Sequence, residues 1–340
     1  MQLRNYIKKF IIIFFICIFS SGTVFSFDEE KYTSDGGYKI KSTNKHFVKI
    51  SDQKTLAYKN EDDDIPGRFL YDQEDITDDY QVHVIYILAS NSKDKKYDVN
   101  GVIEEIVFTG NEYLKSKTDG QQFRLDLTKE GKLDVSFIRV DKKKKKINRI
   151  ENGAGYFAAE AVKHGFYDPK KLYAIFYQDK YQREWGQVGD AFFYGPNEMI
   201  EVAMGVTFLG ENPVMEGFHP YIHELIHVLG FVQLCAPGVM IDDDRDSNWG
   251  IKDHLEYEDD IMSDRGSDLD YMDRYLDKNR IEYYGHSIPN CEMDLKKSAF
   301  LEPTEKDFQL QPRSKSCKLT RWQTKYNHER SLDCLARLNF

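Results

Sequence analysis

The sequence predicts an α+β fold, in which a mixed, twisted sheet with helices packed on it precedes an irregular C-terminal half. Three observations support this fold class. Strand-like apolar runs and helix-like periodicities alternate in the order β-α-β-β-α-β between residues 82 and 177. Residues 220–230 have the pattern of an amphipathic helix. Regular patterning then fades after Gly230, which favours irregular structure in the remainder.

The first strand and the first helix follow from apolar spacing. Residues 82–88 are a near-continuous apolar run, which is typical of a buried strand. From residue 102 to residue 114 apolar side chains recur at helical spacing and predict a helix. Asp98 or Asn100 could cap its first turn, because a side-chain oxygen there can accept from an unpaired backbone N–H.

The next elements repeat these two patterns. Apolar residues alternate with others at 123–127 and again at 133–137, which predicts two half-buried strands. Residues 156–162 predict a second helix that ends before Gly165. Residues 172–177 predict another buried strand. Together with the earlier elements, they predict a sheet that carries helices on its surface.

The central motif of the chain is the HExxH pattern in the expected helix at 220–230. A four-residue step from His223 to His227 places both imidazoles on one helical face, where both can bind one zinc ion. Glu224 projects beside them and can accept a proton from a zinc-bound water, as in metallopeptidases. Pro220 suits the first turn, and Gly230 suits a left-handed C-cap. The alternative is a buried amphipathic helix with two incidental histidines.

A catalytic zinc usually has three protein ligands, so a third must lie elsewhere. In the pattern HExxHxxGxxH a third histidine returns three residues after the glycine. This chain has Gln233 at that position, and glutamine is a poor zinc ligand. His254 is the next histidine, and Asp260-Ile261-Met262 follows it. His219 precedes Pro220, outside the expected helix, and is interpreted as structural.

These motifs resemble those of secreted bacterial metzincin-like peptidases, in which HELxHxxGxxQ precedes Cys-Ala-Pro, a delayed histidine and an Asp-(Ile/Leu/Val)-Met turn. The resemblance covers residues 80–301 and is specific around the helix. The matching residues are His223, Glu224, Leu225, His227, Gly230, Gln233, Cys235, Ala236, Pro237, His254 and Asp260–Met262, with Tyr283–His286, Cys291, Asp294 and Leu295 in the tail.

The resemblance implies a metzincin-like zinc peptidase with His223, His227 and His254 as ligands and Glu224 as base. Met262, in the methionine turn, would be a packing residue beneath the histidines rather than a ligand. Residues 203–209 look like a short strand, and the resemblance implies that this is an edge strand along which a peptide substrate lies, main chain to main chain. An ordinary strand within the sheet is the alternative.

The N-terminus predicts a secretory signal peptide, residues 1–26. A basic start, an apolar run at 10–19 and a small residue at Ser26 are typical of a cleaved leader. This run is shorter than the roughly 20 apolar residues that span a membrane, so no stable membrane insertion is expected after cleavage. Cys17 would leave with the leader. The mature protein is therefore expected to be secreted or periplasmic.

Three further regions follow the leader. Residues 27–78 are polar and are interpreted as an N-terminal extension or a propeptide. An acidic cluster within them, at 61–64, predicts a surface loop, with a calcium site as the alternative. Residues 79–310 form the expected catalytic domain, and residues 311–340 a disulfide-bonded tail.

Charge and cysteine content narrow the choice of partners. A formal net charge of −10 argues against nucleic acid as a partner. Four of the five cysteines remain after the leader, and an exported chain would form two disulfides from them, with three connectivities possible. Cys317 with Cys334 closes a short loop, which leaves Cys235 with Cys291. None has metal-ligand spacing, so no cysteine zinc site is expected.

The sequence thus predicts an exported zinc endopeptidase that acts on a protein or peptide substrate; it assigns no oligomeric state. Tyr283, Tyr284 and His286 are candidate donors to the tetrahedral intermediate. Three alternatives stay open. A gluzincin-like peptidase would use Glu256 as third ligand, because Glu256 and Asp260 fit the spacing ExxxD. A non-catalytic binding module on a peptidase scaffold and a zinc hydrolase acting on cell-wall material are the others.

Overall fold

The computed structural model describes only part of the chain in detail. The described residues are 47–49, 65–150, 153–182, 186–194, 199–233, 235–241, 251–263, 265, 267–289, 291 and 293–310. All of them belong to the second of two compact units, residues 40–340. The expected leader, the acidic cluster at 61–64, and the tail with Cys317 and Cys334 lie outside the described residues. Among the described helices, none is long and apolar enough to cross a membrane.

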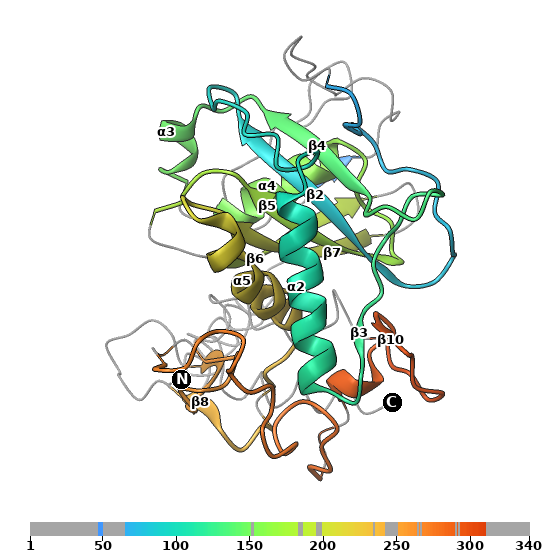
Figure 1. Cartoon of the computed structure of the whole chain (residues 1–340), viewed down its shortest axis with the longest axis vertical. Helices are drawn as coiled ribbons and strands as arrows, with labels where there is room; N and C mark the ends of the chain where they lie inside the picture. Colours follow the sequence, from blue (N-terminus) through green and yellow to red (C-terminus); the bar gives the residue numbers. More distant parts are fainter. Residues whose placement is uncertain are drawn as a thin grey trace, which may run out of the picture. The chain divides into compact units, whose positions relative to one another are not determined.

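A six-stranded sheet forms the upper layer of this unit in Figure 1. Its spatial order is β1-β6-β7-β5-β2-β4, and every neighbouring pair is parallel except β6 with β7. This arrangement confirms the predicted mixed sheet. The strands are β1 (Phe47–Lys49), β2 (Gln81–Ala89), β4 (Val135–Val140), β5 (Lys171–Tyr177), β6 (Gly186–Tyr194) and β7 (Met199–Phe208).

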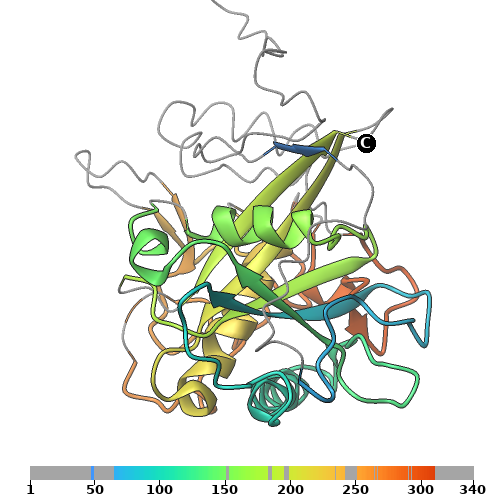
Figure 2. The ribbon, with the colours of Figure 1, turned by 90° about the horizontal axis from the view of Figure 1, so that it is seen from above.

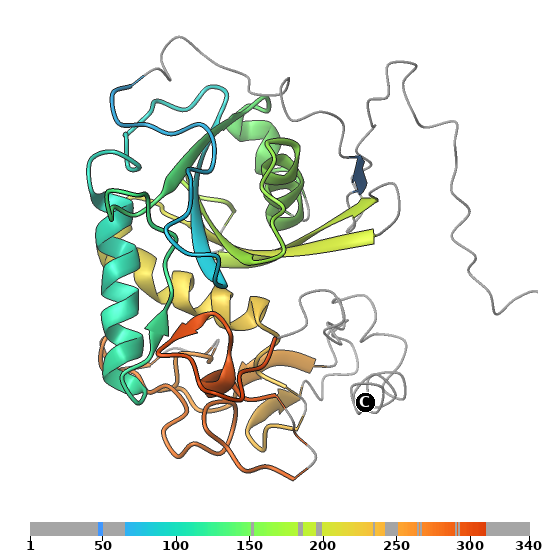
Figure 3. The ribbon, with the colours of Figure 1, turned by 90° about the vertical axis from the view of Figure 1, so that its right-hand side faces the viewer.

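Helices cover both faces of the sheet. In Figures 2 and 3, α4 (Gly153–Lys163) lies on one face, and α2 (Val102–Lys117) and α5 (Pro213–Val228) lie on the other. The alternation of β2 explains how one strand serves both layers, because successive side chains point to opposite faces. Val84 and Tyr86 belong to the core with α2 and α5, whereas Ile85 and Ile87 belong to the core with α4.

Two glycines bring α2 and α5 close together. A β-carbon at Gly110 would lie 2.8 Å from Cδ1 of Tyr221, and one at Gly217 would lie 2.9 Å from Cδ1 of Ile106. Because no side chain fits in these spaces, the two helices approach closely, with α5 next to the sheet. The helix that carries the HExxH motif is therefore held on both sides.

The first helix starts at Val102, as predicted, but its N-cap residue differs from the prediction. Gly101, in the left-handed conformation with φ 89°, takes the N-cap position of α2 in place of Asp98 or Asn100. Asn100 still accepts a hydrogen bond at 3.2 Å from the Val102 N–H. Asp98 pairs with Arg68 instead, with a nitrogen–oxygen distance of 2.6 Å. For Asp98, the expected short-range contact is thus replaced by an ion pair that residue spacing does not reveal.

Two strand predictions need correction. Residues 123–127 form only the short strand β3 (Gln122–Phe123), which pairs with β10 (Leu301–Glu302), while Leu125 and Leu127 make isolated bridges. Strand β7 is longer than expected and lies between β6 and β5, so it is not an edge strand. Its alternative reading, an ordinary strand within the sheet, is correct. The sequence missed β6, which pairs along the whole of β7.

The C-terminal half contains little regular structure, as expected. Its described elements after α5 include a small antiparallel pair, β8 (Val239–Ile241) with β9 (Ile251–Leu255), and a 3₁₀ turn, η3 (Leu295–Lys297). A disulfide joins Cys235 to Cys291, whose Cα atoms are 5.7 Å apart. This is the pairing that the spacing predicted, and it ties the segment after α5 to the end of the domain.

A buried charged cluster joins residues 72–75 to the sheet. The Lys171 ammonium lies 2.6 Å from carboxylate oxygens of Asp72 and Asp75 and 2.7 Å from Asp126. Asp126 also accepts from Nδ1 of the fully buried His83 at 2.7 Å. Four members could hold a metal by distance alone, namely Asp72, His83, Asp126 and Asp134. Lys171 already supplies a cation there, so we interpret the cluster as structural.

Asp134 gives this cluster a pH dependence. Its carboxyl is fully buried, and one oxygen accepts from the Gln73 N–H at 2.7 Å. Its other oxygen has no hydrogen-bond partner among the described residues. Burial raises the pKa of Asp134 from 3.8 to about 6. The native state therefore binds a proton more tightly than the unfolded chain, and the free energy of unfolding falls as pH rises through this window.

We predict that Asp134→Asn stabilises the protein at neutral pH. The amide keeps an acceptor for Gln73 and removes the buried charge, so the free energy of unfolding at pH 7.5 should rise by up to about 3 kcal/mol, with little change at pH 4. Thermal melts of both proteins across this range measure the effect. Exposed Asp141→Asn is the control and should not change the profile. A variant that melts lower than wild type at pH 7.5 would contradict the prediction.

Candidate metal centre

The helix of the HExxH motif begins earlier than the sequence indicated. Pro213 occupies its first turn, so Pro220 and His219 lie inside α5 rather than at its start. Packing explains the difference, because Phe218 is buried in the core shared with α2. Proline in a helix interior costs one backbone hydrogen bond, and here tertiary contacts outweigh that cost. The proline in the first turn of this helix is Pro213 and not Pro220.

The end of α5 agrees with the prediction. Gly230 follows the helix in the left-handed conformation, with φ 93°. Its N–H donates to the His227 carbonyl at 2.9 Å, and the Phe231 N–H donates to the Ile226 carbonyl at 3.2 Å. These two bonds are those of a Schellman motif. The turn also brings the Phe231 carbonyl within 2.8 Å of Nδ1 of His227.

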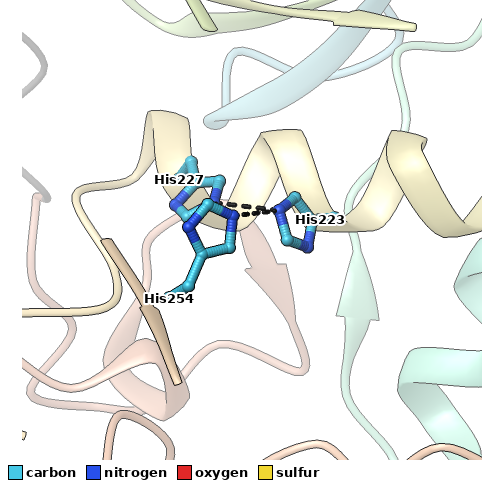
Figure 4. Close-up of side chains that lie close together, drawn as sticks. All are labelled: His223, His227 and His254. Carbon is cyan, nitrogen blue, oxygen red and sulfur yellow. Dashed lines mark hydrogen bonds between the residues drawn. The ribbon is translucent and has the colours of Figure 1, made fainter. Parts of the chain in front are cut away.

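Three imidazoles converge beside this helix. Nε2 of His223 lies 3.0 Å from Nε2 of His227 and 3.1 Å from Nε2 of His254, and the remaining pair is separated by 3.3 Å. Figure 4 shows the three rings turned toward one another, two from α5 and one from the segment below it. This group could hold a metal ion. Zn–N bonds of about 2.0–2.1 Å in tetrahedral geometry place nitrogens about 3.3 Å apart.

The outer nitrogens of the two helical rings fix their tautomers. Nδ1 of His223 donates to the Ile261 carbonyl at 2.7 Å, and Nδ1 of His227 donates to the Phe231 carbonyl. Since a carbonyl only accepts, each neutral ring carries its proton on Nδ1 and a lone pair on Nε2. Lone pairs that face one another at 3.0 Å repel unless a cation lies between them. The donor set therefore fits a divalent metal that prefers imidazole, such as zinc.

His254 and the Asp-Ile-Met turn come from one segment. His254 is on β9, and the N–H of the next residue, Leu255, donates to the Met262 carbonyl at 2.9 Å. Met262 is fully buried in the hydrophobic core, consistent with a packing role. The hydrogen bond thus links the third imidazole to the turn that also offers Ile261 to His223.

Asp260 holds that turn in place. Its carboxylate accepts from the Met262 N–H and the Asp277 N–H, both at 2.8 Å, and from the Tyr283 hydroxyl at 3.0 Å. Burial raises the pKa of Asp260 to about 7 even so. Asp277 in turn accepts from the backbone N–H groups of residues 281–284. The carboxylates of Asp260 and Asp277 therefore hold the backbone of the segments that follow His254.

Glu224 lies against the sheet. It is 8% exposed, and a β-carbon at Gly186, the first residue of β6, would come within 2.6 Å of its Cγ and Oε1. A β-carbon at Gly205 would lie 3.4 Å from its Cβ. Two glycines on neighbouring strands thus leave the space that this side chain occupies. Neither glycine could be recognised from residue spacing, because the contact depends on how α5 crosses the sheet.

Other candidate ligands lie elsewhere. The amide oxygen of Gln233 lies 3.2 and 3.4 Å from the sulfur atoms of Cys235 and Cys291, so this side chain contacts the disulfide. Glu256 and Glu258 are exposed, and neither belongs to the histidine group found among the described residues. Of the candidates weighed for a third ligand, the structure brings only His254 to the histidine pair.

The three expected oxyanion donors have structural contacts instead. The Tyr283 hydroxyl donates to Asp260, and the Tyr284 hydroxyl donates to Gln121 at 2.8 Å. Nε2 of His286 donates to the Met293 carbonyl at 2.8 Å. Their role as donors at the site is therefore a wrong expectation, because their polar atoms hold together segments of the C-terminal half.

The sequence missed a group of side chains next to His223. The ring centroid of His219 lies 5.6 Å from that of His223 and 4.5 Å from that of Tyr271. Arg274 donates from Nη1 to Nε2 of His219 at 3.2 Å. Burial, followed by His223 and Arg274, holds the pKa of His219 well below its usual value. The only available signal was the position of His219 four residues before His223, on the same helical face.

Comparisons with known proteins add little to this geometry. No model of a known protein family matches the chain, and no curated protein resembles it closely enough to count as a relative. Among solved structures, wild-type OgpA from Akkermansia muciniphila has 14% sequence identity and a TM-score of 0.32, covering 48% of this chain and 52% of that chain. Catalytically inactive OgpA in complex with an O-glycopeptide, glycodrosocin, has 15% identity and a TM-score of 0.27, covering 46% and 48%. The chain thus spans about half the length of OgpA, and this likeness carries no functional argument.

We predict that His254 is needed to retain zinc. His254→Ala removes one of three converging nitrogens and should weaken zinc binding by orders of magnitude, whereas loss of an outer group costs about 10 to 100-fold. Metal analysis after dialysis should find zinc lost from His254→Ala and kept by Gln233→Ala, Glu256→Ala and Glu258→Ala. Stoichiometric zinc in His254→Ala together with loss from Glu256→Ala would make the site gluzincin-like.

Proposed function

We propose that this protein is an exported zinc endopeptidase with a metzincin-like site, in which His223, His227 and His254 hold the metal and Glu224 is the general base. The observation that carries the proposal is the convergence of three imidazole nitrogens at 3.0–3.3 Å, two of them from the helix that also carries the buried Glu224. Export rests on the leader-like residues 1–26. Substrates would be proteins or peptides outside the cytoplasm.

Each residue has a distinct role in this proposal. When bound, zinc supplies Lewis-acid polarisation of the scissile carbonyl and lowers the pKa of water toward about 7. Glu224 takes a proton from the attacking water and returns it to the leaving amine. The Ile261 and Phe231 carbonyls keep the two helical imidazoles in the tautomer that offers Nε2. Burial of Glu224 against Gly186 limits its movement.

Strand β6 is a better candidate than β7 for binding an extended substrate. β7 is paired on both sides, whereas the outer side of β6 pairs with β1 only at residues 192–194 among the described strands. Its first residue, Gly186, touches Glu224. A peptide added along this part of β6 by main-chain hydrogen bonds would pass beside the proposed base. Such binding depends little on side chains and suits an endopeptidase.

The alternatives have less support. A gluzincin-like site needs Glu256 near the histidine pair, yet this side chain is exposed and its backbone N–H donates to the Gly238 carbonyl at 2.9 Å. A non-catalytic binding module would have no use for Glu224, which is buried on the same helix as His223 and His227, with space left for it by Gly186. No observation favours a cell-wall hydrolase over a peptidase.

Glu224→Gln tests the base directly. The variant keeps the shape of the side chain but cannot take a proton, so it should keep zinc and lose hydrolysis by about two to four orders of magnitude. Cleavage of an unfolded protein such as reduced casein, together with metal analysis, measures both properties. If the zinc-loaded variant cleaves as fast as wild type, Glu224 is not the base.

Gly186→Ala tests the contact between β6 and the base. The added β-carbon would lie 2.6 Å from Glu224, so the carboxylate must move. We expect at least a tenfold loss of hydrolysis, estimated as a small misplacement of a catalytic group, with zinc content unchanged. Glu224→Asp in the Gly186→Ala background shortens the side chain and relieves the clash. A thermal melt of Gly186→Ala that matches wild type then assigns its loss of hydrolysis to displacement of Glu224 rather than to misfolding. Full activity of Gly186→Ala would overturn this account.

A further inference from the structure

Arg274 is a buried cation that is separated from His223 by the ring of His219. It is 6% exposed and follows the Asp-Ile-Met turn in the chain. Its backbone is anchored, because its N–H donates to the Asp270 carbonyl at 3.2 Å and its own carbonyl accepts from the Tyr113 hydroxyl at 3.2 Å. Tyr113 is a fully buried residue of α2. The backbone at Arg274 is therefore held by the core of the domain.

This guanidinium has fewer partners than its burial requires. Nη1 donates to His219, and the group lies over the Tyr271 ring, 5.0 Å from its centroid. Its Nε has no hydrogen-bond partner among the described residues, and no described carboxylate lies within 4.0 Å of it. Buried charges are normally paired with an opposite charge. A guanidinium also has five N–H donors, of which this contact uses one.

Another buried arginine in the same domain shows the usual arrangement. Arg68 has a side chain that is 1% exposed, and it pairs with Asp94 at 2.8 Å and Asp98 at 2.6 Å. The hydrogen-bond partner of the Arg274 side chain among the described residues is His219. That ring accepts through Nε2, so it is neutral and cannot compensate the positive charge of Arg274. The charge of Arg274 is thus left without a compensating anion in the part of the chain that the structure describes.

His219 connects this cation to the metal group. Its ring stacks on His223 with an interplanar angle of 29°, and on its other side it contacts Tyr271. The row Arg274–His219–His223 thus leads from the guanidinium to the first of the converging imidazoles. If a peptide bond is held at the three histidines, a carboxylate bound by Arg274 would come from a substrate residue near that bond.

We propose that Arg274, supported by His219 and Tyr271, forms a subsite for a carboxylate of the substrate. The inference rests on the proposed peptidase function and specifies its substrate class, peptides with an acidic group beside the cleaved bond. Arginine suits this task because its planar fork can bind a carboxylate through two N–H groups. The carboxylate could be an Asp or Glu side chain or the C-terminus of the peptide, and the test separates these sources.

Binding to zinc-loaded Glu224→Gln protein tests the subsite without relying on hydrolysis. Three labelled hexapeptide pools are compared by fluorescence polarisation: one with Glu residues and an amidated end, one with Gln and an amidated end, and one with Gln and a free C-terminus. We expect at least tenfold tighter binding of the first pool or the third than of the second. The pool that gains affinity identifies the source of the carboxylate.

Variants then assign the preference to Arg274. Arg274→Gln should abolish the difference, Arg274→Lys should keep part of it, and the exposed Arg265→Gln should leave it intact. Thermal melts check that each variant folds. Equal affinity for all three pools, no measurable binding of any, or a preference that survives Arg274→Gln would overturn the subsite.

Hydrolysis by wild type separates the two proposals. Cleavage of peptides without acidic preference would remove the subsite and leave the peptidase intact. Conversely, selective binding of acidic peptides with no cleavage by the zinc-loaded wild-type protein would remove the peptidase and leave an acidic-peptide binding site at Arg274.

Discussion

The convergence of three imidazoles is the constraint on which the arrangement below the sheet depends. Two of the three rings, His223 and His227, present Nε2 lone pairs to each other at 3.0 Å, so the structure around them must set their positions. Backbone carbonyls from two different turns do this for His223 and His227. Each turn is itself fixed, one by Gly230 and the other by Asp260. The turns below the sheet therefore hold the imidazole rings in place.

Two different kinds of structure hold the rings: close helix packing for His223 and His227, and buried carboxylates for the segment that carries His254. The helix α5 is locked between the sheet and α2 by close glycine contacts, so two imidazoles and Glu224 have little freedom. His254 comes from a segment with little regular structure, and hydrogen bonds replace sheet or helix there. Asp260 and Asp277 accept most of these bonds from backbone N–H groups. A short irregular chain can be held precisely when such charge-assisted bonds are buried.

Local chemistry made part of this predictable from the sequence. The spacing of His223 and His227 and the glycine stop at Gly230 depend only on helix geometry, and the strands β2 and β5 depend only on apolar runs. What failed was non-local. Pro220 looked like a helix start because its burial by tertiary packing is invisible in sequence. Strand β6 was missed, and with it the interior position of β7, because pairing partners are not encoded by periodicity.

Charge explains why Arg274 matters more than its place in the sequence would suggest. The chain carries a formal net charge of −10, so an acidic substrate group is repelled by the average field of the protein. In such a chain carboxylates are abundant, and two buried cations, Arg68 and Lys171, have them as neighbours. Arg274, which has no carboxylate partner among the described residues, would offset that repulsion locally beside the three histidines. Selectivity would then come from a single short-range interaction acting against a long-range one.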